Sequence, residues 1–500
     1  MKKEPLKLRE HQTIGVAMAK NQWKYASENG VRKCFAIYDE MGAGKTAVLV
    51  NILRHAFAEI GHVEKTLIIS PLITLGNWGQ EIDRFSKINS RDVLILNQKT
   101  GRKKLQAFLN AVSDPKTLQM VRNRVVVMNY ECVQNADLFD ALLKWKPTIV
   151  GIDEAHRIRN HKSKRAKLIR QLTDRSQHTY VMTGTPILNS AQDVFHLYQT
   201  MDGGATFGNN FYAFRNRYFQ DNNAGWSTKP GYFPDFEERA ESFSELNRKM
   251  YFWPDGTHKA RRVLKKDCLD LPNFTRYAIS VELSNEQQKM YREMRDEFIT
   301  FVQELKNEGK PLAVVANLAI TKALRLMQIT SGFVKAEDGV EYTIKDNPRL
   351  AALKELLEDH GSGKVIVWAC FKHNYIDVAR VCTELKLPYT MIHGGISAKD
   401  KEANMKAFRQ DPKLKVMIAN QGAGGIGVNL VEAPLAITFS RDFSLEKHLQ
   451  AEARNYRGGS EMHDKVTHID LIAKNSIDEL VVQALSNKQS ISDKILDLEI

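Results

Sequence analysis

The chain has 500 residues and a net charge of +13, from 72 lysines and arginines against 59 aspartates and glutamates. Its length suffices for roughly three domains, and 43% hydrophobic with 26% charged residues is typical of a folded globular protein. No apolar run approaches the roughly 18 residues of a membrane span, and no secretion signal begins the chain, so we expect neither a secreted nor a membrane protein.

The five cysteines are scattered without a C-x-x-C pair, which argues against a zinc site or a disulfide framework. We therefore expect a reducing, cytoplasmic location. The basic surplus favours a polyanionic partner such as nucleic acid, although an ordinary solvated surface is the alternative.

The first notable residue in chain order is Gln12, in the segment LREHQ that opens an expected helix. The amide of a glutamine both donates and accepts, so Gln12 is a candidate reader of an adenine edge. Considered alone, it is better explained as a surface glutamine on a helix.

The segment Cys34–Ala47, CFAIYDEMGAGKTA, carries the strongest chemical signal. A short apolar strand leads into a glycine loop and then into a helical pattern, an arrangement that cradles phosphate with backbone N–H groups and a helix N-terminus. Lys45 is expected to contact the β- and γ-phosphates of ATP, and the Thr46 hydroxyl to bind Mg²⁺. Asp39 stands where the usual motif has its first glycine. The predicted nucleotide-binding loop comprises Asp39, Glu40, Met41, Gly42, Ala43, Gly44, Lys45 and Thr46.

Between residues 65 and 200, short β-branched runs alternate with helical patterns. The expected strands are Thr66–Ser70, Val93–Leu96, Val125–Met128, Thr148–Ile152 and Thr179–Met182. This alternation predicts a parallel sheet covered by helices on both faces, with ligands at the carboxyl ends of its strands.

Two motifs lie at such strand ends. In IVGIDEAHRIRN, Asp153 is expected to hold Mg²⁺ partly through water, Glu154 to polarise the attacking water, and His156 to couple the site to neighbouring groups. In MTGTPILN, Thr183 and Thr185 flank a glycine. Each motif alone is explained by a polar turn, but the two together continue the series that the glycine loop begins.

Residues 201–275 interrupt the alternation with many aromatic and basic residues. These aromatics either stack on single-stranded bases or form the core of a small helical insertion, and we favour the core. Trp226, in the loop-like NNAGWSTKPG, is a candidate exposed tip. The basic run that starts at Arg261-Arg262 is interpreted as a linker or a phosphate-facing hinge.

The C-terminal half begins with an amphipathic helix over Leu283–Leu305 and returns to βα alternation. Its expected strands are Val365–Ala369, Tyr389–Ile392, Lys415–Ile418, Ala436–Phe439 and Val466–Leu471. This second sheet has no phosphate loop of its own. Gln450, Arg454 and Arg457 are placed on one helix, where the i, i+3 spacing directs both arginines to one face. They are candidate fingers for a phosphate bound elsewhere, or a solvated basic helix.

Taken together, the motifs resemble the Swi/Snf-type branch of superfamily-two helicase-like ATPases, over nearly the whole chain. They are, in order, LREHQ, DEMGAGKT, SPLITLGNW, DEAHRIRN, MTGTPILN, RRVLKKD, IHGGIS, QGAGGIGVNL and QAEARNYR. The resemblance implies two RecA-like α/β lobes with helical protrusions, ATP in the cleft between the lobes and DNA across both. It implies Gln12 as adenine reader, Lys45 and Thr46 as phosphate and Mg²⁺ ligands, Asp153 and Glu154 as the acidic pair, Thr183 and Thr185 as the coupling motif, and Arg454 and Arg457 as fingers.

One departure is that Arg457 is followed by Gly458-Gly459-Ser460, where the family continues with Ile-Gly-Gln. No appended chromatin-reading domain is recognisable, so the chain resembles the compact motors of bacteria and their viruses. We expect an N-terminal lobe over residues 1–200, the aromatic insertion and linker over 201–275, a helical protrusion over 276–345 and a C-terminal lobe over 346–500.

The predicted function is that of a monomeric, DNA-stimulated ATPase that translocates on duplex DNA without sequence preference to remodel protein–DNA complexes or branched DNA, as in DNA repair or recombination. A strand-separating or branch-migrating helicase is one alternative. An ATP-switched DNA clamp that does not move is another, and the intact Glu154, Arg454 and Arg457 argue against it.

Overall fold

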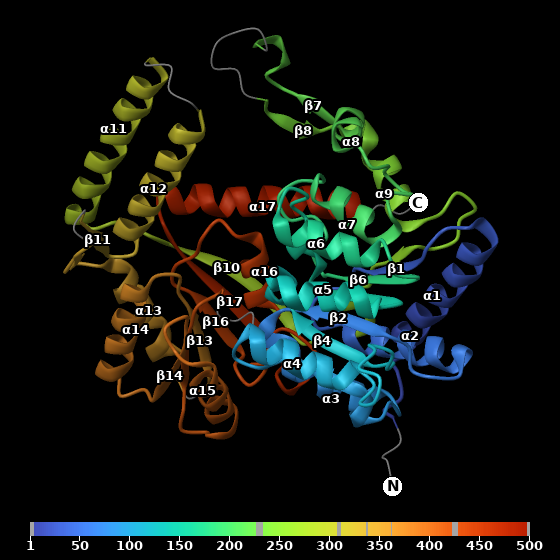
Figure 1. The fold of residues 1–500 in the computed structure, drawn as a ribbon. Coiled ribbons are helices and arrows are strands. Elements are labelled where there is room, and N and C mark those ends of the chain that lie inside the picture. The colour runs from blue at the N-terminus through green and yellow to red at the C-terminus, as the bar shows by residue number, and fades with distance from the viewer. Residues whose placement is uncertain are drawn as a thin grey trace. The chain divides into compact units, whose positions relative to one another are not determined.

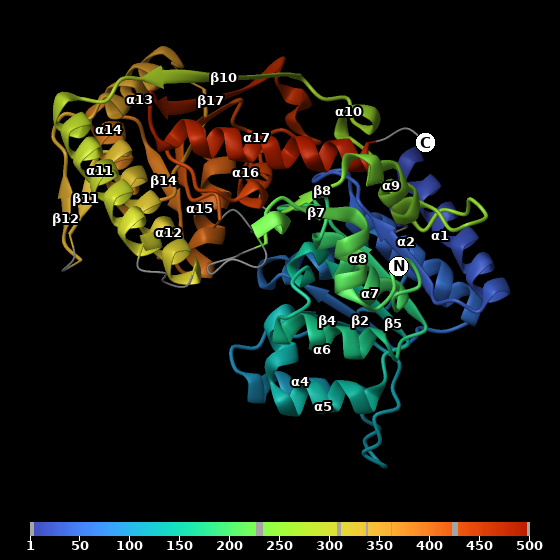
Figure 2. The same ribbon diagram turned by 90° about the horizontal axis from the view of Figure 1, so that it is seen from above.

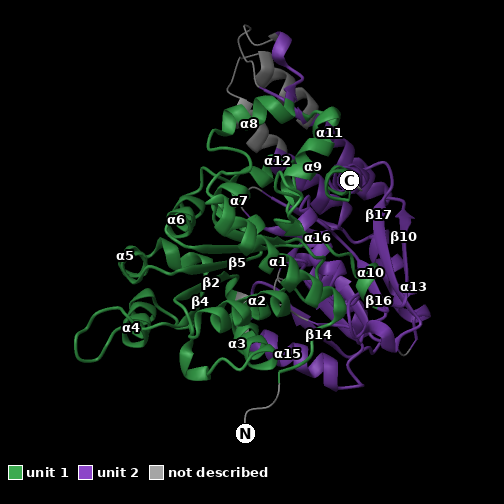
Figure 3. Cartoon of the chain, turned by 90° about the vertical axis from the view of Figure 1, so that its right-hand side faces the viewer, with its two compact units in different colours: residues 1–219, 238–269, 490–500 green, residues 220–237, 270–489 purple. Residues whose placement is uncertain are grey.

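The computed structural model describes residues 5–226, 234–307, 312–336, 339–361, 363–422 and 429–497. The chain divides into two compact units (Figure 3). The first unit comprises residues 1–219, 238–269 and 490–500, and the second comprises residues 220–237 and 270–489. Each unit is built on one parallel sheet covered by helices (Figure 1), so the predicted α/β fold with two parallel-sheet lobes is confirmed. Among the described residues, no helix is long and apolar enough to cross a membrane.

The sheet of the first unit has the strand order β3-β4-β2-β5-β6-β1-β9, with every pairing parallel. Its strands are β1 (Lys33–Ile37), β2 (Thr66–Ser70), β3 (Val93–Ile95), β4 (Val125–Asn129), β5 (Ile149–Asp153), β6 (His178–Met182) and β9 (Ala260–Arg261). Strands β2, β4, β5 and β6 are buried along their whole length. This explains why unbroken β-branched runs predicted them within one or two residues.

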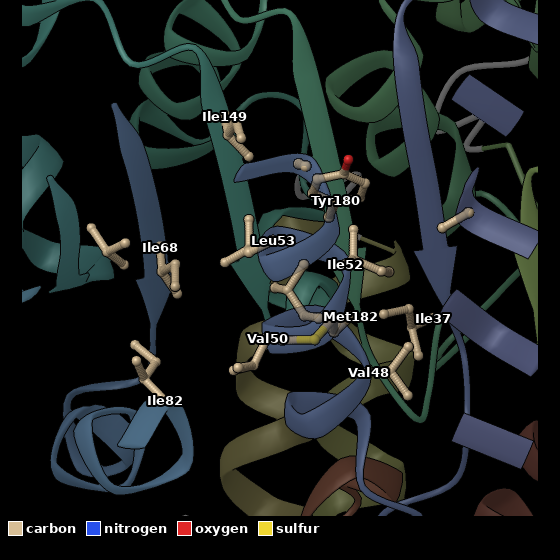
Figure 4. Close-up of a cluster of buried hydrophobic side chains, with 14 of the residues drawn as sticks. Ile37, Val48, Val50, Ile52, Leu53, Ile68, Ile82, Ile149, Tyr180 and Met182 are labelled. Carbon is tan, nitrogen blue, oxygen red and sulfur yellow. The ribbon is translucent and has the colours of Figure 1, made fainter. Parts of the chain in front are cut away.

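Helices cover both faces of this sheet. The helices of the first unit are α1 (Glu10–Asn29), α2 (Lys45–Ile60), α3 (Leu75–Phe85), α4 (Gly101–Val112), α5 (Ala136–Trp145), α6 (Lys164–Thr173), α7 (Asp193–Asp202), α8 (Phe211–Tyr218), α9 (Phe243–Tyr251) and α10 (Lys265–Cys268). Side chains of α1, α2 and α3 share one hydrophobic cluster with the strands (Figure 4). From β3 the chain returns across the sheet, and right-handed crossovers then place α4, α5 and α6 on the opposite face (Figure 2).

The sheet of the second unit has the order β10-β17-β16-β13-β15-β14 and is also parallel. Its strands are β10 (Asn273–Val281), β13 (Val365–Trp368), β14 (Tyr389–Ile392), β15 (Val416–Ala419), β16 (Leu435–Thr438) and β17 (Lys465–Ala473). Its helices are α11 (Asn285–Asn307), α12 (Leu312–Thr330), α13 (Pro348–Asp359), α14 (Lys372–Glu384), α15 (Ala398–Gln410), α16 (Leu445–Glu452) and α17 (Ile477–Leu496), whose last residues belong to the first unit. Two short antiparallel pairs complete the strands, β7 (Phe219–Asp221) with β8 (Phe236–Glu238) and β11 (Phe333–Lys335) with β12 (Glu341–Thr343).

Strands β9 and β10 were not expected from the sequence. Arg261, the first residue of the basic run, ends strand β9 and pairs with Ile37 of β1, and the first unit's part of this segment ends at Leu269. Strand β10 was not predicted, because its half-exposed sequence lacks the continuous apolar run of the buried strands. The two-residue β9 is likewise too short for any periodicity to show.

The aromatic segment forms packed clusters, as the favoured interpretation required. Phe214 and Tyr218 are buried, with ring centroids 5.0 Å apart, and Phe207 lies 5.1 Å from Phe214. Tyr212 is the exception, with 61% of its surface exposed. The side chain of Trp226 and residues 227–233 lie outside the described part of the chain.

Candidate nucleotide-binding and catalytic site

The glycine loop connects β1 to α2 in the first unit. Gly42 and Gly44 have φ angles of +94° and +89°, a left-handed conformation that favours glycine. A Cβ atom on Gly44 would also lie 2.3 Å from Nε2 of Gln12. Helix α2 begins at Lys45, so its free N–H groups face the loop, and the ammonium of Lys45 donates to the carbonyl of Asp39 at 2.9 Å and that of Glu40 at 3.2 Å. The loop therefore has the backbone shape of a phosphate cradle.

The first three residues of the predicted loop, Asp39, Glu40 and Met41, contact other parts of the protein through their side chains or backbone. The carboxylate of Asp39 is fully buried and accepts two hydrogen bonds from Arg261, so Asp39 joins the cradle through its backbone carbonyl and not its side chain. Glu40 likewise faces the protein, because its carboxylate accepts from the backbone N–H of Lys265 at 2.5 Å. Met41 lies against Gly184, where an added Cβ would approach it to 3.2 Å.

Gln12 is placed beside this loop at the start of α1. Its Oε1 accepts from the backbone N–H of Arg9 at 3.0 Å, and its Nε2 donates to the carbonyl of Ala43 at 3.5 Å. His11 contacts the same carbonyl through Nε2 at 3.0 Å. The sequence analysis singled out Gln12 but not His11, which shares its contact with the loop.

The acidic pair lies at the end of β5, the second strand along the sheet from β1, where Asp153 is the last residue of the strand and Glu154 follows it. Asp153 accepts hydrogen bonds through Oδ2 from the Ser70 hydroxyl at 2.9 Å and from Nε1 of Trp78 at 3.3 Å. Burial, and then the neighbouring charge of Glu154, raise the pKa of Asp153 to about 6. Sequence reasoning missed Ser70 and Trp78, although both lie in segments that it examined.

Glu154 has a left-handed backbone, with φ of +52°, that is uncommon for a residue with a side chain. The hydroxyl of Tyr130 holds this turn by donating to the carbonyls of Asp153 at 2.6 Å and Glu154 at 3.1 Å. Oε2 of Glu154 is buried and accepts no hydrogen bond from the described residues. A buried oxygen of this kind fits a site that binds water or a ligand.

A chain of contacts links the acidic pair to the threonine motif. Nδ1 of the fully buried His156 lies 3.5 Å from Oε2 of Glu154 and 3.0 Å from the hydroxyl of Thr183. The Thr183 hydroxyl in turn accepts from the backbone N–H of Thr185 at 3.1 Å. Oγ of Thr185 is a second buried atom without a hydrogen-bond partner among the described residues. The three strand-end motifs of the first unit thus lie together.

The remaining predicted residues belong to the second unit. Gln450 is on α16 and donates to the carboxylate of Glu446 at 3.2 Å. The prediction that Arg454 and Arg457 share this helix is wrong, because α16 ends at Glu452 and both arginines lie in the turns that follow. The buried amide of Asn455 donates to the carbonyl of Ala433 at 2.9 Å and fixes this turn against the sheet.

Few side chains of the described residues are suited to bind a metal ion at this site. The described residues contain no group of three His, Cys, Asp or Glu side chains arranged around a cation. Thr46, in the first turn of α2, and the buried Asp153 are oxygen donors of the kind Mg²⁺ uses when phosphate and water supply the rest of its shell. The donor set therefore fits a magnesium ion that arrives with a nucleotide.

A parallel α/β unit with a lysine-bearing glycine loop and an acidic pair at a nearby strand end defines the class of P-loop ATPases. Family comparison gives the particular branch. The SNF2-related domain matches residues 12–330, and the helicase conserved C-terminal domain matches residues 348–459. Because the first match spans more than half of the chain, the protein belongs to the SNF2-related family and is a helicase-like ATP hydrolase. The resemblance seen in the sequence is confirmed.

Similar curated proteins include the CHD3-type chromatin-remodeling factor PICKLE of Arabidopsis thaliana, 26% identical over 491 residues that cover 90% of this chain and 32% of PICKLE. The mouse Chromodomain-helicase-DNA-binding protein 1-like is 26% identical over 474 residues, covering 92% of this chain and 47% of that protein. The chain thus spans less than half the length of these relatives. A solved structure, the Sulfolobus solfataricus SWI2/SNF2 ATPase core in complex with dsDNA, aligns over 100% of both chains with 19% identity and a TM-score of 0.42.

Proposed function

We propose that the protein is an ATP-driven motor that translocates on duplex DNA and remodels protein–DNA complexes or branched DNA. The observation that carries this proposal is the series of contacts from Glu154 through the buried His156 to Thr183. It connects the candidate general base to the end of the neighbouring strand, which supports a role in coupling the phosphates to the sheet. A clamp that only binds ATP has no need for a hydrolytic base.

Each residue of the site then has a role. Lys45 and the backbone of the loop bind the ATP phosphates, Gln12 contacts the base, and Glu154 orients and polarises the attacking water. Thr46 and Asp153 would hold Mg²⁺, which neutralises phosphate charge when it is bound. Arg454 and Arg457 are proposed to contact the phosphates as arginine fingers, as the family resemblance implies.

DNA as the partner is supported by the net charge of +13 and by the relatives, which are named as chromatin-remodelling and DNA-binding proteins. The charge acts through the phosphate backbone and carries no sequence information, which supports binding without sequence preference.

The test measures ATPase rates without nucleic acid and with single-stranded DNA, duplex DNA, forked DNA and RNA. We expect duplex DNA to stimulate the rate most. In parallel, ATP should drive displacement of a third strand from a triplex while a forked duplex stays paired, because strand separation must overcome stacking of roughly 1.4 kcal/mol per base-pair step.

Two results would contradict the proposal in different ways. Efficient fork unwinding would favour the strand-separating helicase. Duplex binding with ATP-dependent affinity, but without triplex displacement, would favour the stationary clamp. Lys45→Ala is the negative control in every assay.

A further inference from the structure

The edge strand β9 brings an arginine from distant sequence to the nucleotide loop. Arg261 pairs with Ile37, the last residue of β1, and is only 4% exposed. The backbone continues this pairing past the strand, since Tyr38 donates to the carbonyl of Arg261 at 2.8 Å and Glu40 donates to that of Val263 at 2.9 Å. The segment that carries Arg261 thus runs beside the first residues of the loop.

The guanidinium of Arg261 donates three hydrogen bonds to two residues, Asp39 and His11. Nε donates to Oδ1 of Asp39 at 2.9 Å and Nη2 donates to Oδ2 at 2.6 Å, while Nη1 donates to the carbonyl of His11. The Asp39 carboxylate is 0% exposed. A bidentate, charge-assisted pair away from water fixes both groups in orientation as well as in distance.

The two residues that Arg261 binds, Asp39 and His11, both adjoin the nucleotide loop. The carbonyl of Asp39 accepts from the ammonium of Lys45, and the residue after His11 is Gln12, whose amide contacts the loop at Ala43. We infer that Arg261 is a positioning residue for ATP, which holds the phosphate loop and the start of α1 in the mutual geometry that the nucleotide requires. This inference extends the ATPase assignment and does not depend on movement along DNA.

The identity of residue 15 is a second observation that supports this position of the Arg261 guanidinium. Gly15 lies within α1, where glycine is less favourable than alanine. A Cβ atom on Gly15 would lie 2.0 Å from Nη1 and 2.7 Å from Cζ of Arg261. Glycine at this position therefore leaves the space that the guanidinium occupies. Gly15→Ala displaces the guanidinium without removing any charge.

The experiment compares Gly15→Ala with Gly79→Ala. Gly79 lies in α3 of the same unit, and an added Cβ there would meet only Ile95 at an ordinary 3.9 Å. Affinity for a ribose-labelled fluorescent ATP analogue is titrated without DNA, and thermal melting is recorded for both variants. We expect Gly15→Ala to weaken nucleotide binding about tenfold, or about 1.4 kcal/mol, and Gly79→Ala to change it less than about twofold. Unchanged affinity in Gly15→Ala would overturn the inference.

A second pair separates positioning from general destabilisation. Arg261→Met is compared with Arg32→Met. Arg261 pairs with the last residue of β1, whereas Arg32 precedes the first residue of β1, at the end away from the loop. Arg32 pairs with Asp174 at 3.6 Å and donates to the Thr200 carbonyl at 3.3 Å. At a temperature where both variants are folded, Arg261→Met should raise the KM for ATP at least about tenfold, while Arg32→Met should not. Arg261→Lys should be intermediate, because an ammonium cannot form the two-bonded fork.

Equal changes in KM for the two methionine variants would assign Arg261 a purely structural role. Failure of DNA translocation leaves this test intact, since both measurements concern the nucleotide alone.

Discussion

The two units carry the same kind of parallel sheet, yet within the described part of the chain only the first presents a phosphate loop. In the first unit, residues 38–44 separate β1 from α2 and include the two left-handed glycines. In the second unit, only residues 369–371 separate β13 from α14. The shorter connection leaves little backbone with which to surround a phosphate.

The backbone groups of the short connection are also occupied. The N–H of Cys370 donates to the hydroxyl of Ser440 at 3.0 Å, and that hydroxyl donates to Asn374 at 2.9 Å. Asn420 donates to the carbonyls of Ala369 at 3.3 Å and Cys370 at 3.4 Å. Topology thus supplies the place at a strand end, whereas loop length and the partners of the loop's N–H groups decide whether phosphate binds there.

The largest effect should come from the residues that make the first unit catalytic. Lys45→Ala should abolish both ATP binding and hydrolysis, because it removes the phosphate-binding ammonium. Glu154→Gln should keep ATP affinity and lower turnover at least about 10²-fold, since the side chain acts on the attacking water. Binding and single-turnover assays distinguish the two variants.

Lys372→Ala is the matched control in the second unit, because Lys372 begins α14 as Lys45 begins α2. It should leave ATP affinity unchanged. Near-normal hydrolysis by Glu154→Gln would show that another group is the general base.

The next effect tests whether the unit without a loop takes part in catalysis. Arg457→Ala should reduce DNA-stimulated turnover on the order of 10³-fold, the low end for an arginine finger, with a much smaller change in ATP affinity. Steady-state kinetics with saturating DNA measures both quantities. Arg409→Ala, which removes an exposed arginine paired with Glu432 at 3.0 Å, is the control. An equal loss of affinity and rate would instead mean that Arg457 stabilises the turn after α16.

A smaller effect contrasts the two strand-end connections directly. Gly44→Ala should weaken ATP binding at least about tenfold, because alanine is strained at φ of +89° and its Cβ would meet Gln12. Ser440→Ala should cost about 1 kcal/mol of stability, since it removes the acceptor of the part-buried N–H of Cys370, while ATP affinity stays the same. Nucleotide titration of both variants measures the change in ATP affinity, and urea denaturation of both measures the change in stability. Loss of ATP affinity in Ser440→Ala would contradict the contrast.

The smallest effect concerns pH, to which the two units should respond with opposite sign. Burial, and then the charge of Glu154, raises the pKa of Asp153 to about 6, so its contribution to stability is complete below the unfolded value of 3.8 and is lost as the pH rises through 6. Burial, followed by Arg276 and Arg441, lowers the pKa of His448 to about 3. Its contribution is complete above the unfolded value of 6.5 and is lost as the pH falls toward 3.

Between pH 7 and 5, the second unit should therefore lose up to about 1.4 kcal/mol per pH unit below 6.5, while the first gains stability from Asp153. Hydrogen exchange in β5 and in β16 at the two pH values measures each unit separately. His448→Gln should remove the acid sensitivity of β16, and Asp153→Asn that of β5. Unchanged sensitivity of β16 in His448→Gln would assign the effect to other groups.

Much of the architecture was predictable because it depends on local patterns. Short runs of apolar and β-branched residues are typical of parallel strands, and they predicted β2 and β14 at their observed bounds and their neighbours to within one or two residues. The loop of Gly42, Gly44 and Lys45 was equally visible, since its chemistry depends on residue types at fixed spacing. The acidic pair was predictable from its position at the end of the apolar run that forms β5.

Tertiary structure decided what distant residues do to these motifs. The partner of Asp39 lies 222 positions away, so no spacing rule pointed to Arg261. The end of α16 at Glu452 depends on Asn455 bonding to Ala433 in another segment, and helical periodicity alone carries no sign of that bond. Strand β9 is formed by two residues whose pairing with β1 exists only once the sheet is assembled. Local sequence thus specifies which chemical groups are available, whereas packing between distant segments specifies which of them remain free to bind a ligand.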